Sequence, residues 1–172
     1  MDKKKGLTLG EITLFAVLGA MTFAAKMAMA LLPNIEPVSL MVMVFAVVFG
    51  WKGLYPVYVY VMMEILWFGL GTWNVNYLYI WGVLAVAAML MRGSRNRLSW
   101  AILSGAFGLL FGALCAPVDA VIGGLGFAVT KWASGILFDI AHCAGNFVIA
   151  LLLFEPLRTL LTRLYGKMMA KA

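Results

Sequence analysis

Six apolar stretches run along the chain, separated by short segments that contain charged residues, prolines or glycines. They lie at about residues 11–32, 38–49, 54–70, 76–91, 98–116 and 132–154. A helix needs about 20 residues to cross the hydrocarbon core of a membrane, and shorter helices are accommodated by local thinning or by neighbouring helices. The pattern therefore predicts an all-α integral membrane protein, in which residues 1–172 form one domain, a bundle of six transmembrane helices.

Two of the connecting segments are irregular in different ways. The segment 33–37 places two prolines around Asn34, Ile35 and Glu36, which predicts a stiff turn. The segment 117–131 contains Asp119 and three glycines but is otherwise mostly apolar. Because non-helical backbone in a membrane must be covered by protein or line a cavity, we expect this segment to dip into the membrane or to lie across its surface.

Positive charge is distributed unevenly among the connections. Eleven of the thirteen basic residues precede the first stretch, follow the sixth, or lie in the second and fourth connections. They are Lys3, Lys4, Lys5, Lys52, Arg92, Arg95, Arg97, Arg158, Arg163, Lys167 and Lys171. Positive charge close to the ends of spans stays on the cytoplasmic side. The pattern therefore predicts that both termini are cytoplasmic and that the protein is multi-pass.

The composition also indicates a membrane protein. Hydrophobic residues make up 65% of the chain and charged residues 12%, too few to cover the core of a soluble domain of this length. The net charge of +6 comes from clusters at the ends of spans rather than from one basic face, so we expect no nucleic-acid partner. The first stretch has no evident small-residue cleavage site, so we expect no cleavable signal peptide. Cys115 and Cys143 are expected to be buried free thiols.

Small residues recur at every fourth position of the first and fifth stretches. Residues spaced by four share one helix face, and small side chains there let another helix approach closely. In the fifth stretch we expect packing inside the bundle, whereas in the first both internal packing and contact with another membrane protein remain open. These residues are Ala16, Ala20, Ala24 and Ala28 in the first stretch, and Ser104, Gly108, Gly112 and Ala116 in the fifth.

Four ionisable residues interrupt the apolar stretches. With both termini inside, Lys26, Glu64, Asp139 and His142 all fall in the outer half of the membrane. Ionisable groups inside spans usually face a cavity or a partner, so this shared depth predicts a site. Asp139, His142 and Asn146 are spaced to form one polar stripe along the sixth helix.

Aromatic and amide side chains surround these polar groups in the sequence. A cavity with aromatic walls and a few convergent polar groups suits an organic ligand with ring character. Two structural alternatives remain: Lys26 neutralises Glu64 or Asp139 as an internal ion pair, and Trp73 and Trp132 belong to the interfacial belt of aromatic residues. The remaining aromatic and amide residues are Tyr60, Trp67, Asn74, Asn76, Tyr77, Tyr79 and Trp81.

An enzymatic function has little support in the sequence. The chain has one histidine and no zinc-protease, dinucleotide-binding or P-loop motif. Asp139 and His142 would suit acid–base chemistry, but no nucleophile or metal-binding cluster accompanies them. We therefore expect no catalytic residue, no cofactor and no metal, and any ATP hydrolysis must come from other subunits.

The chain resembles the substrate-binding S component of the energy-coupling factor (ECF) vitamin transporters. The likeness covers the small size, the six helices, the internal termini and the alanine pattern Ala16, Ala20 and Ala24 of the first helix, which Gly19 widens. The segments 34–38 (Asn-Ile-Glu-Pro-Val) and 138–142 (Phe-Asp-Ile-Ala-His) are similar to those of one S-component subgroup.

The resemblance implies partners and a mechanism. The alanine face of the first helix would pack against a transmembrane T component, which two ATPase subunits drive, in a bacterial plasma membrane. The substrate would lie in the outer half of the bilayer, under the connection 33–38, and the S component would topple in the membrane to deliver it.

We therefore predict a membrane-embedded subunit that binds a vitamin or a related micronutrient. The expected polar contacts are Glu36, Glu64, Asp139, His142 and Asn146, and the expected apolar walls are Trp67, Tyr77 and Trp81. Lys26 is either a ligand contact or an internal counter-ion. Acidic groups outnumber basic ones in this region, which favours a ligand rich in hydrogen-bond donors or positive charge, such as a corrinoid or a small nitrogen heterocycle. The alternatives are a self-sufficient small transporter or channel and, with less support, an intramembrane enzyme.

Overall fold

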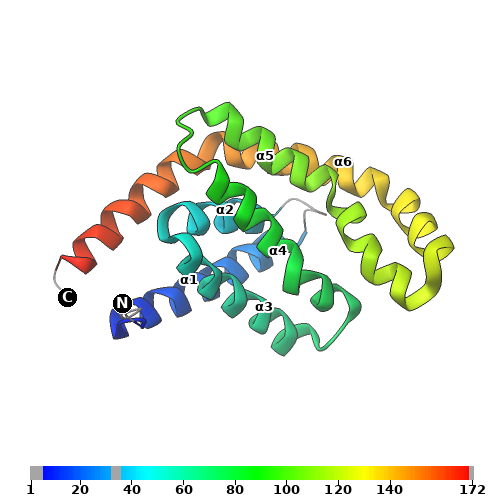
Figure 1. Cartoon of the computed structure of the whole chain (residues 1–172), viewed down its shortest axis with the longest axis horizontal. Coiled ribbons are helices and arrows are strands. Elements are labelled where there is room, and N and C mark those ends of the chain that lie inside the picture. Colours follow the sequence, from blue (N-terminus) through cyan, green and yellow to red (C-terminus); the bar gives the residue numbers. More distant parts are fainter. Residues whose placement is uncertain (1–5, 32–35, 171–172) are drawn as a thin grey trace, which may run out of the picture.

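The computed structural model describes residues 6–31 and 36–170 (Figure 1). These residues contain six α-helices, one 3-10 helix and no strand, which confirms the predicted all-α class. The elements are α1 (Leu9–Ala28), α2 (Val38–Phe49), η1 (Gly50–Gly53), α3 (Leu54–Phe68), α4 (Thr72–Leu90), α5 (Arg97–Leu109) and α6 (Phe111–Met169).

Local side-chain chemistry fixes several helix ends. Thr8 and Glu11 form a capping box at the start of α1, in which each side chain bonds the backbone N–H of the other residue. The backbone N–H of Gly71 donates to Oδ1 of Asn74 over 2.7 Å, so α4 begins four residues earlier than the expected start at 76. α1 ends at Ala28 rather than at 32, and the expected turn at 33–37 lies largely outside the described residues.

The expected non-helical connection at 117–131 is wrong. Helix α6 runs from Phe111 to Met169, and its one non-helical residue is Gly124, with φ 82° and ψ 169°. A positive φ is easy only for glycine, so this single residue reverses the chain, and Figure 1 shows the two arms of α6 folding back on each other there. The second arm also continues through Pro156, beyond the expected end at 154.

Helix α5 and the first residues of α6 pack closely against the second arm of α6. A Cβ atom on Gly108 would lie 2.8 Å from the backbone of His142, and one on Gly112 would lie 2.5 Å from Oδ2 of Asp139. The small residues of the fifth stretch therefore pack inside the bundle, as the sequence predicts.

The short helix α2 occupies the centre of the molecule. Ten of its 12 residues are buried, and it contacts α4, α6 and α3. At about 1.5 Å per residue it is about 18 Å long, whereas the hydrocarbon core of a membrane is about 30 Å thick. The surrounding helices cover α2, so its length does not have to match the thickness of a membrane.

Four helical stretches in the described part of the chain are long and apolar enough to cross a membrane. They are Leu9–Ala28, Val38–Phe68, Thr72–Leu90 and Arg97–Met169. The number is four rather than six because α2 continues through η1 into α3, and α5 continues into α6, without a full interruption. Large apolar side chains also cover much of the outer surface, among them Leu66, Leu90 and Leu137. The fold is therefore compatible with a membrane bundle.

A group of polar contacts joins three elements at one end of the bundle. Glu11 of α1 accepts hydrogen bonds from Lys52 of η1 and Tyr165 of α6, each over 2.6 Å. Both termini lie on this left side of Figure 1, whereas the connection between α3 and α4 and the reversal in α6 lie on the right. We call the side that holds the termini the terminal end and the other the distal end.

Candidate functional site

Lys26 lies at the centre of a polar cluster at the distal end. Its ammonium group lies 2.8 Å from Oε2 of Glu64 and 3.9 Å from Oε2 of Glu36. The ammonium also donates to the Tyr60 hydroxyl over 3.3 Å and lies 5.4 Å from the ring centroid of Tyr77. The structure therefore contains the ion pair between Lys26 and Glu64 that the sequence offered as one of the two roles for Lys26.

Glu36 is the member of this Lys26 cluster that lies outside the helices. Burial raises the pKa of its carboxyl group, the positive charge of Lys26 opposes that rise, and the negative charge of Glu64 adds to it. Burial of Glu36 thus favours the protonated form of its carboxyl group.

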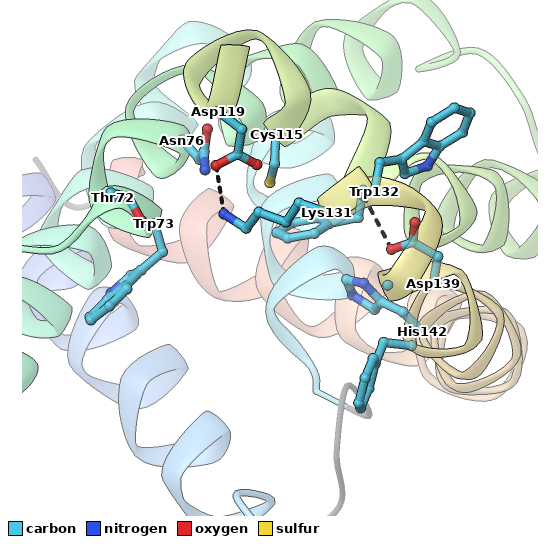
Figure 2. A pocket seen from close by; sticks show the side chains of 13 residues that line it. Thr72, Trp73, Asn76, Cys115, Asp119, Lys131, Trp132, Asp139 and His142 are labelled. Atoms are coloured by element: carbon cyan, nitrogen blue, oxygen red, sulfur yellow. Dashed lines mark hydrogen bonds and ion pairs between the residues drawn. The ribbon is translucent and has the colours of Figure 1, made fainter. Parts of the chain in front are cut away.

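A separate cavity of about 320 Å³ lies between α4 and the two arms of α6 (Figure 2). It is lined by Thr72, Trp73, Asn76, Phe111, Gly112, Cys115, Asp119, Lys131, Trp132, Gly135, Phe138, Asp139 and His142. We refer to it as the α4–α6 cavity.

Asp139 and His142 are two of the four buried polar residues that line the α4–α6 cavity, beside Asn76 and Asp119. Asp139 is 6% exposed and His142 is 4% exposed. The backbone N–H of Gly112 donates to Oδ1 of Asp139 over 3.1 Å, which fixes the orientation of the carboxylate. Oδ2 of Asp139 and Nε2 of His142 are buried and have no hydrogen-bond partner among the described residues. Each atom therefore has an unused hydrogen-bonding position.

An ion pair closes the side of the α4–α6 cavity that lies toward the reversal of α6. Nζ of Lys131 lies 2.5 Å from Oδ1 of Asp119, as the dashed line in Figure 2 shows. Asp119 and Lys131 lie on opposite arms of α6, so the pair also holds the two arms together. The sequence interpretation missed this pair because it placed both residues in a non-helical connection.

Aromatic rings separate the α4–α6 cavity from the Lys26 cluster. The ring centroid of Phe111 lies 5.0 Å from that of His142 and 6.5 Å from that of Tyr77. Trp73 lines both the α4–α6 cavity and a neighbouring cavity of about 280 Å³, which also contacts Lys26 and Glu64. The two polar groups are therefore neighbours at the same end of the bundle, as their predicted depth implies.

Three of the expected contacts lie outside both the cavities and the Lys26 cluster. Nδ2 of Asn146 donates to Ser39 over 3.0 Å and to the carbonyl oxygen of Ser104 over 3.4 Å, which ties α6 to α2 and α5. Trp81 is fully buried in the aromatic core. Trp67 is 67% exposed on the outer surface, where its ring packs against that of Phe23.

The alanine face of α1 points outward. Ala16 and Ala24 are exposed and Ala20 is half-buried. Gly19 lies on a different face, because a Cβ atom there would lie 2.6 Å from Val59 and 2.7 Å from the carbonyl oxygen of Pro56. Ala16 and Ala24 thus lie on the outer surface with Ala20 partly covered between them, while Gly19 lets α1 approach α3.

Comparisons with known proteins give no relative for this chain. No protein family, no curated protein and no solved structure matches it. The sequence patterns and the geometry of the two polar groups are therefore the features that indicate a function.

Proposed function

We propose that this chain is the membrane-embedded substrate-binding subunit of an ECF-type importer. The observation that carries the proposal is the α4–α6 cavity, whose buried Asp139 and His142 side chains each have an unpartnered polar atom. The cavity lies at the distal end, which the distribution of positive charge assigns to the outside of the cell. A site of this kind is suited to capturing a small molecule from the medium.

The outward alanine face of α1 supports a transport complex. Small side chains let another transmembrane helix approach closely, and the exposed Ala16 and Ala24 provide such a surface. In the proposed mechanism, the T component docks there and two ATPase subunits drive toppling of the loaded subunit. The chain contains no P-loop of its own, so the energy must come from these partners.

The proposed substrate is a vitamin or related micronutrient. Four acidic residues, Glu36, Glu64, Asp119 and Asp139, lie at the distal end among the described residues, against the basic Lys26 and Lys131. This excess of negative charge supports a ligand that donates hydrogen bonds or carries positive charge. Asp139 and His142 are its proposed polar contacts.

Substitutions on α1 test the proposal. Ala16→Trp and Ala20→Trp should abolish co-purification with the T component and the ATPases, because an indole ring prevents close helix packing. Ala106→Trp on the exposed face of α5 is the matched control and should assemble normally. Normal assembly of both α1 variants would contradict the proposal, and uptake by the purified chain alone in liposomes would favour a self-sufficient transporter instead.

A further inference from the structure

We propose that the α4–α6 cavity recognises a planar, positively charged nitrogen ligand through two adjacent N–H groups, one bound by Asp139 and the other by His142. The ligand class is that of an amidine, or of an amino-substituted nitrogen heterocycle protonated on the ring. This inference rests on the proposed function and specifies the substrate for the same site.

The two acceptor atoms come from one face of α6. Asp139 and His142 are three residues apart, so their side chains project in similar directions along the helix. Gly112 anchors Oδ1 of Asp139, which leaves Oδ2 as the acceptor for the ligand. Nε2 of His142 is buried without a partner among the described residues. The proposal puts the proton of the neutral imidazole on Nδ1, which makes Nε2 the acceptor. An N–C–N edge that carries two N–H groups complements this pair of acceptors.

The charge of the lining residues selects a cation. Lys131 already neutralises Asp119 over 2.5 Å, whereas Asp139 has no ion-pair partner in the described part of the chain. A buried carboxylate without a counter-charge is costly inside a membrane protein. A positively charged ligand supplies that counter-charge, while an anionic ligand would be repelled by it.

The walls and size of the cavity select a small ring system. Phe111, Trp73 and Trp132 present aromatic side chains around the polar groups, which suits a flat cationic ring. The volume of about 320 Å³ lies at the lower end of the range of about 300–1,000 Å³ for ligand pockets. One or two fused rings fit such a space, whereas a corrinoid macrocycle is much larger.

The neighbouring Lys26 cluster is less suited to bind the charged group. Both of its carboxylates, Glu36 and Glu64, already share the ammonium of Lys26. A cationic ligand would have to compete with that ammonium, whereas Asp139 has no such competitor.

A matched series of probes tests the ligand class. Benzamidine, benzamide and benzoate share one ring and differ in charge and in the number of N–H donors. With the full chain in lipid nanodiscs, calorimetry should show that benzamidine binds at least tenfold more tightly than benzamide and that benzoate does not bind. Equal or tighter binding of benzoate, or no binding of benzamidine, would overturn the proposal.

Two substitutions test the location of the site. Asp139→Asn should weaken benzamidine binding at least tenfold, while the control Glu155→Gln, on the same helix at the terminal end, should leave it unchanged. Gly112→Ala should also weaken binding, because its methyl group would lie 2.5 Å from Oδ2 of Asp139, whereas Gly82→Ala on α4 meets open space. Should Asp139→Asn fail to fold, Gly112→Ala and the probe series decide the question.

The outcomes separate this inference from the function on which it rests. If both Asp139→Asn and Gly112→Ala bind benzamidine as the wild type does, the assigned site is wrong. If the wild-type chain assembles with the T component but does not bind benzamidine, the proposed ligand class is wrong and the proposed function is still supported. If it binds benzamidine with the predicted selectivity but does not assemble, the ligand class is supported and the proposed transport complex is contradicted.

Discussion

The ammonium of Lys26 on α1 lies 2.8 Å from Oε2 of Glu64 on α3. The Glu64 side chain is 2% exposed and that of Lys26 is 21% exposed, so the carboxylate depends on this ammonium for its counter-charge. The pair therefore joins two helices and neutralises a charge that neither lipid nor the core would tolerate alone.

Removing one member of this pair should destabilise the protein more than removing both. Lys26→Met leaves a buried carboxylate without a counter-charge and should lower the free energy of unfolding by about 3 kcal/mol, whereas Lys26→Met with Glu64→Met should recover most of that loss. Unfolding in detergent, followed for both single variants and the double variant, provides the measurement. A double variant as unstable as the sum of the two single variants would show that the groups are not coupled.

Glu36 should make stability depend on pH in a defined direction. Burial raises the pKa of its carboxyl group, so the folded chain binds a proton there at a pH where the unfolded chain does not. The charged Glu36 carboxylate therefore lowers the free energy of unfolding at neutral pH. This loss disappears as the pH falls below the pKa of the unfolded chain, about 4.3. Glu36→Gln should therefore unfold at a higher temperature than the wild type at pH 7.5 and at a similar temperature near pH 4. A difference that widens on acidification would contradict this account.

The network around Glu11 predicts an unequal effect of two tyrosine substitutions. The hydroxyl group of Tyr165 donates to the fully buried Glu11 carboxylate over 2.6 Å, while that of Tyr58 donates to the Leu78 carbonyl oxygen over 2.8 Å in an exposed position. Tyr165→Phe should cost about 1.5–3 kcal/mol, and Tyr58→Phe about 0.5–1.5 kcal/mol at most. Chemical unfolding of both variants measures the difference, and equal losses would mean that Tyr165 does not stabilise the Glu11 charge.

The apolar stretches predicted the existence of most helices, because the length of an apolar stretch and the residues that end it are local properties of the sequence. The start of α2 at Val38 and that of α3 at Leu54 agree with the structure. The segment 117–131 was misassigned because its glycines suggested a loop, whereas only Gly124 leaves the helical conformation. A long apolar segment with one positive-φ glycine forms a helical hairpin, and its partners across the turn, such as Asp119 and Lys131, cannot be identified from composition.

The sequence predicted where the candidate site residues lie along the bundle, but not which way each side chain faces around its helix. From their positions along the predicted helices, Lys26, Glu64, Asp139 and His142 were expected at one end of the bundle, and the structure has them there. Depth does not show which way each helix is rotated, so Trp67 and Asn146 were assigned to the site although one faces outward and the other ties three helices together. Gly112 was identified only as a packing residue, because its hydrogen bond to Asp139 comes from the backbone.

Accessibility of the two ends of the bundle tests the central claim, that the cavities open toward the outside of the cell. In a chain with Cys115→Ala and Cys143→Ala, a cysteine is introduced at Leu70, between α3 and α4, or at Gly93, between α4 and α5. Both positions are exposed, and no neighbouring atom lies within 4 Å of a Cβ built on Gly93. Intact cells are then treated with a membrane-impermeant maleimide. We predict that Leu70→Cys is labelled and that Gly93→Cys is labelled only after permeabilisation, whereas labelling of Gly93→Cys in intact cells would place the cavities in the cytoplasm and contradict the uptake function.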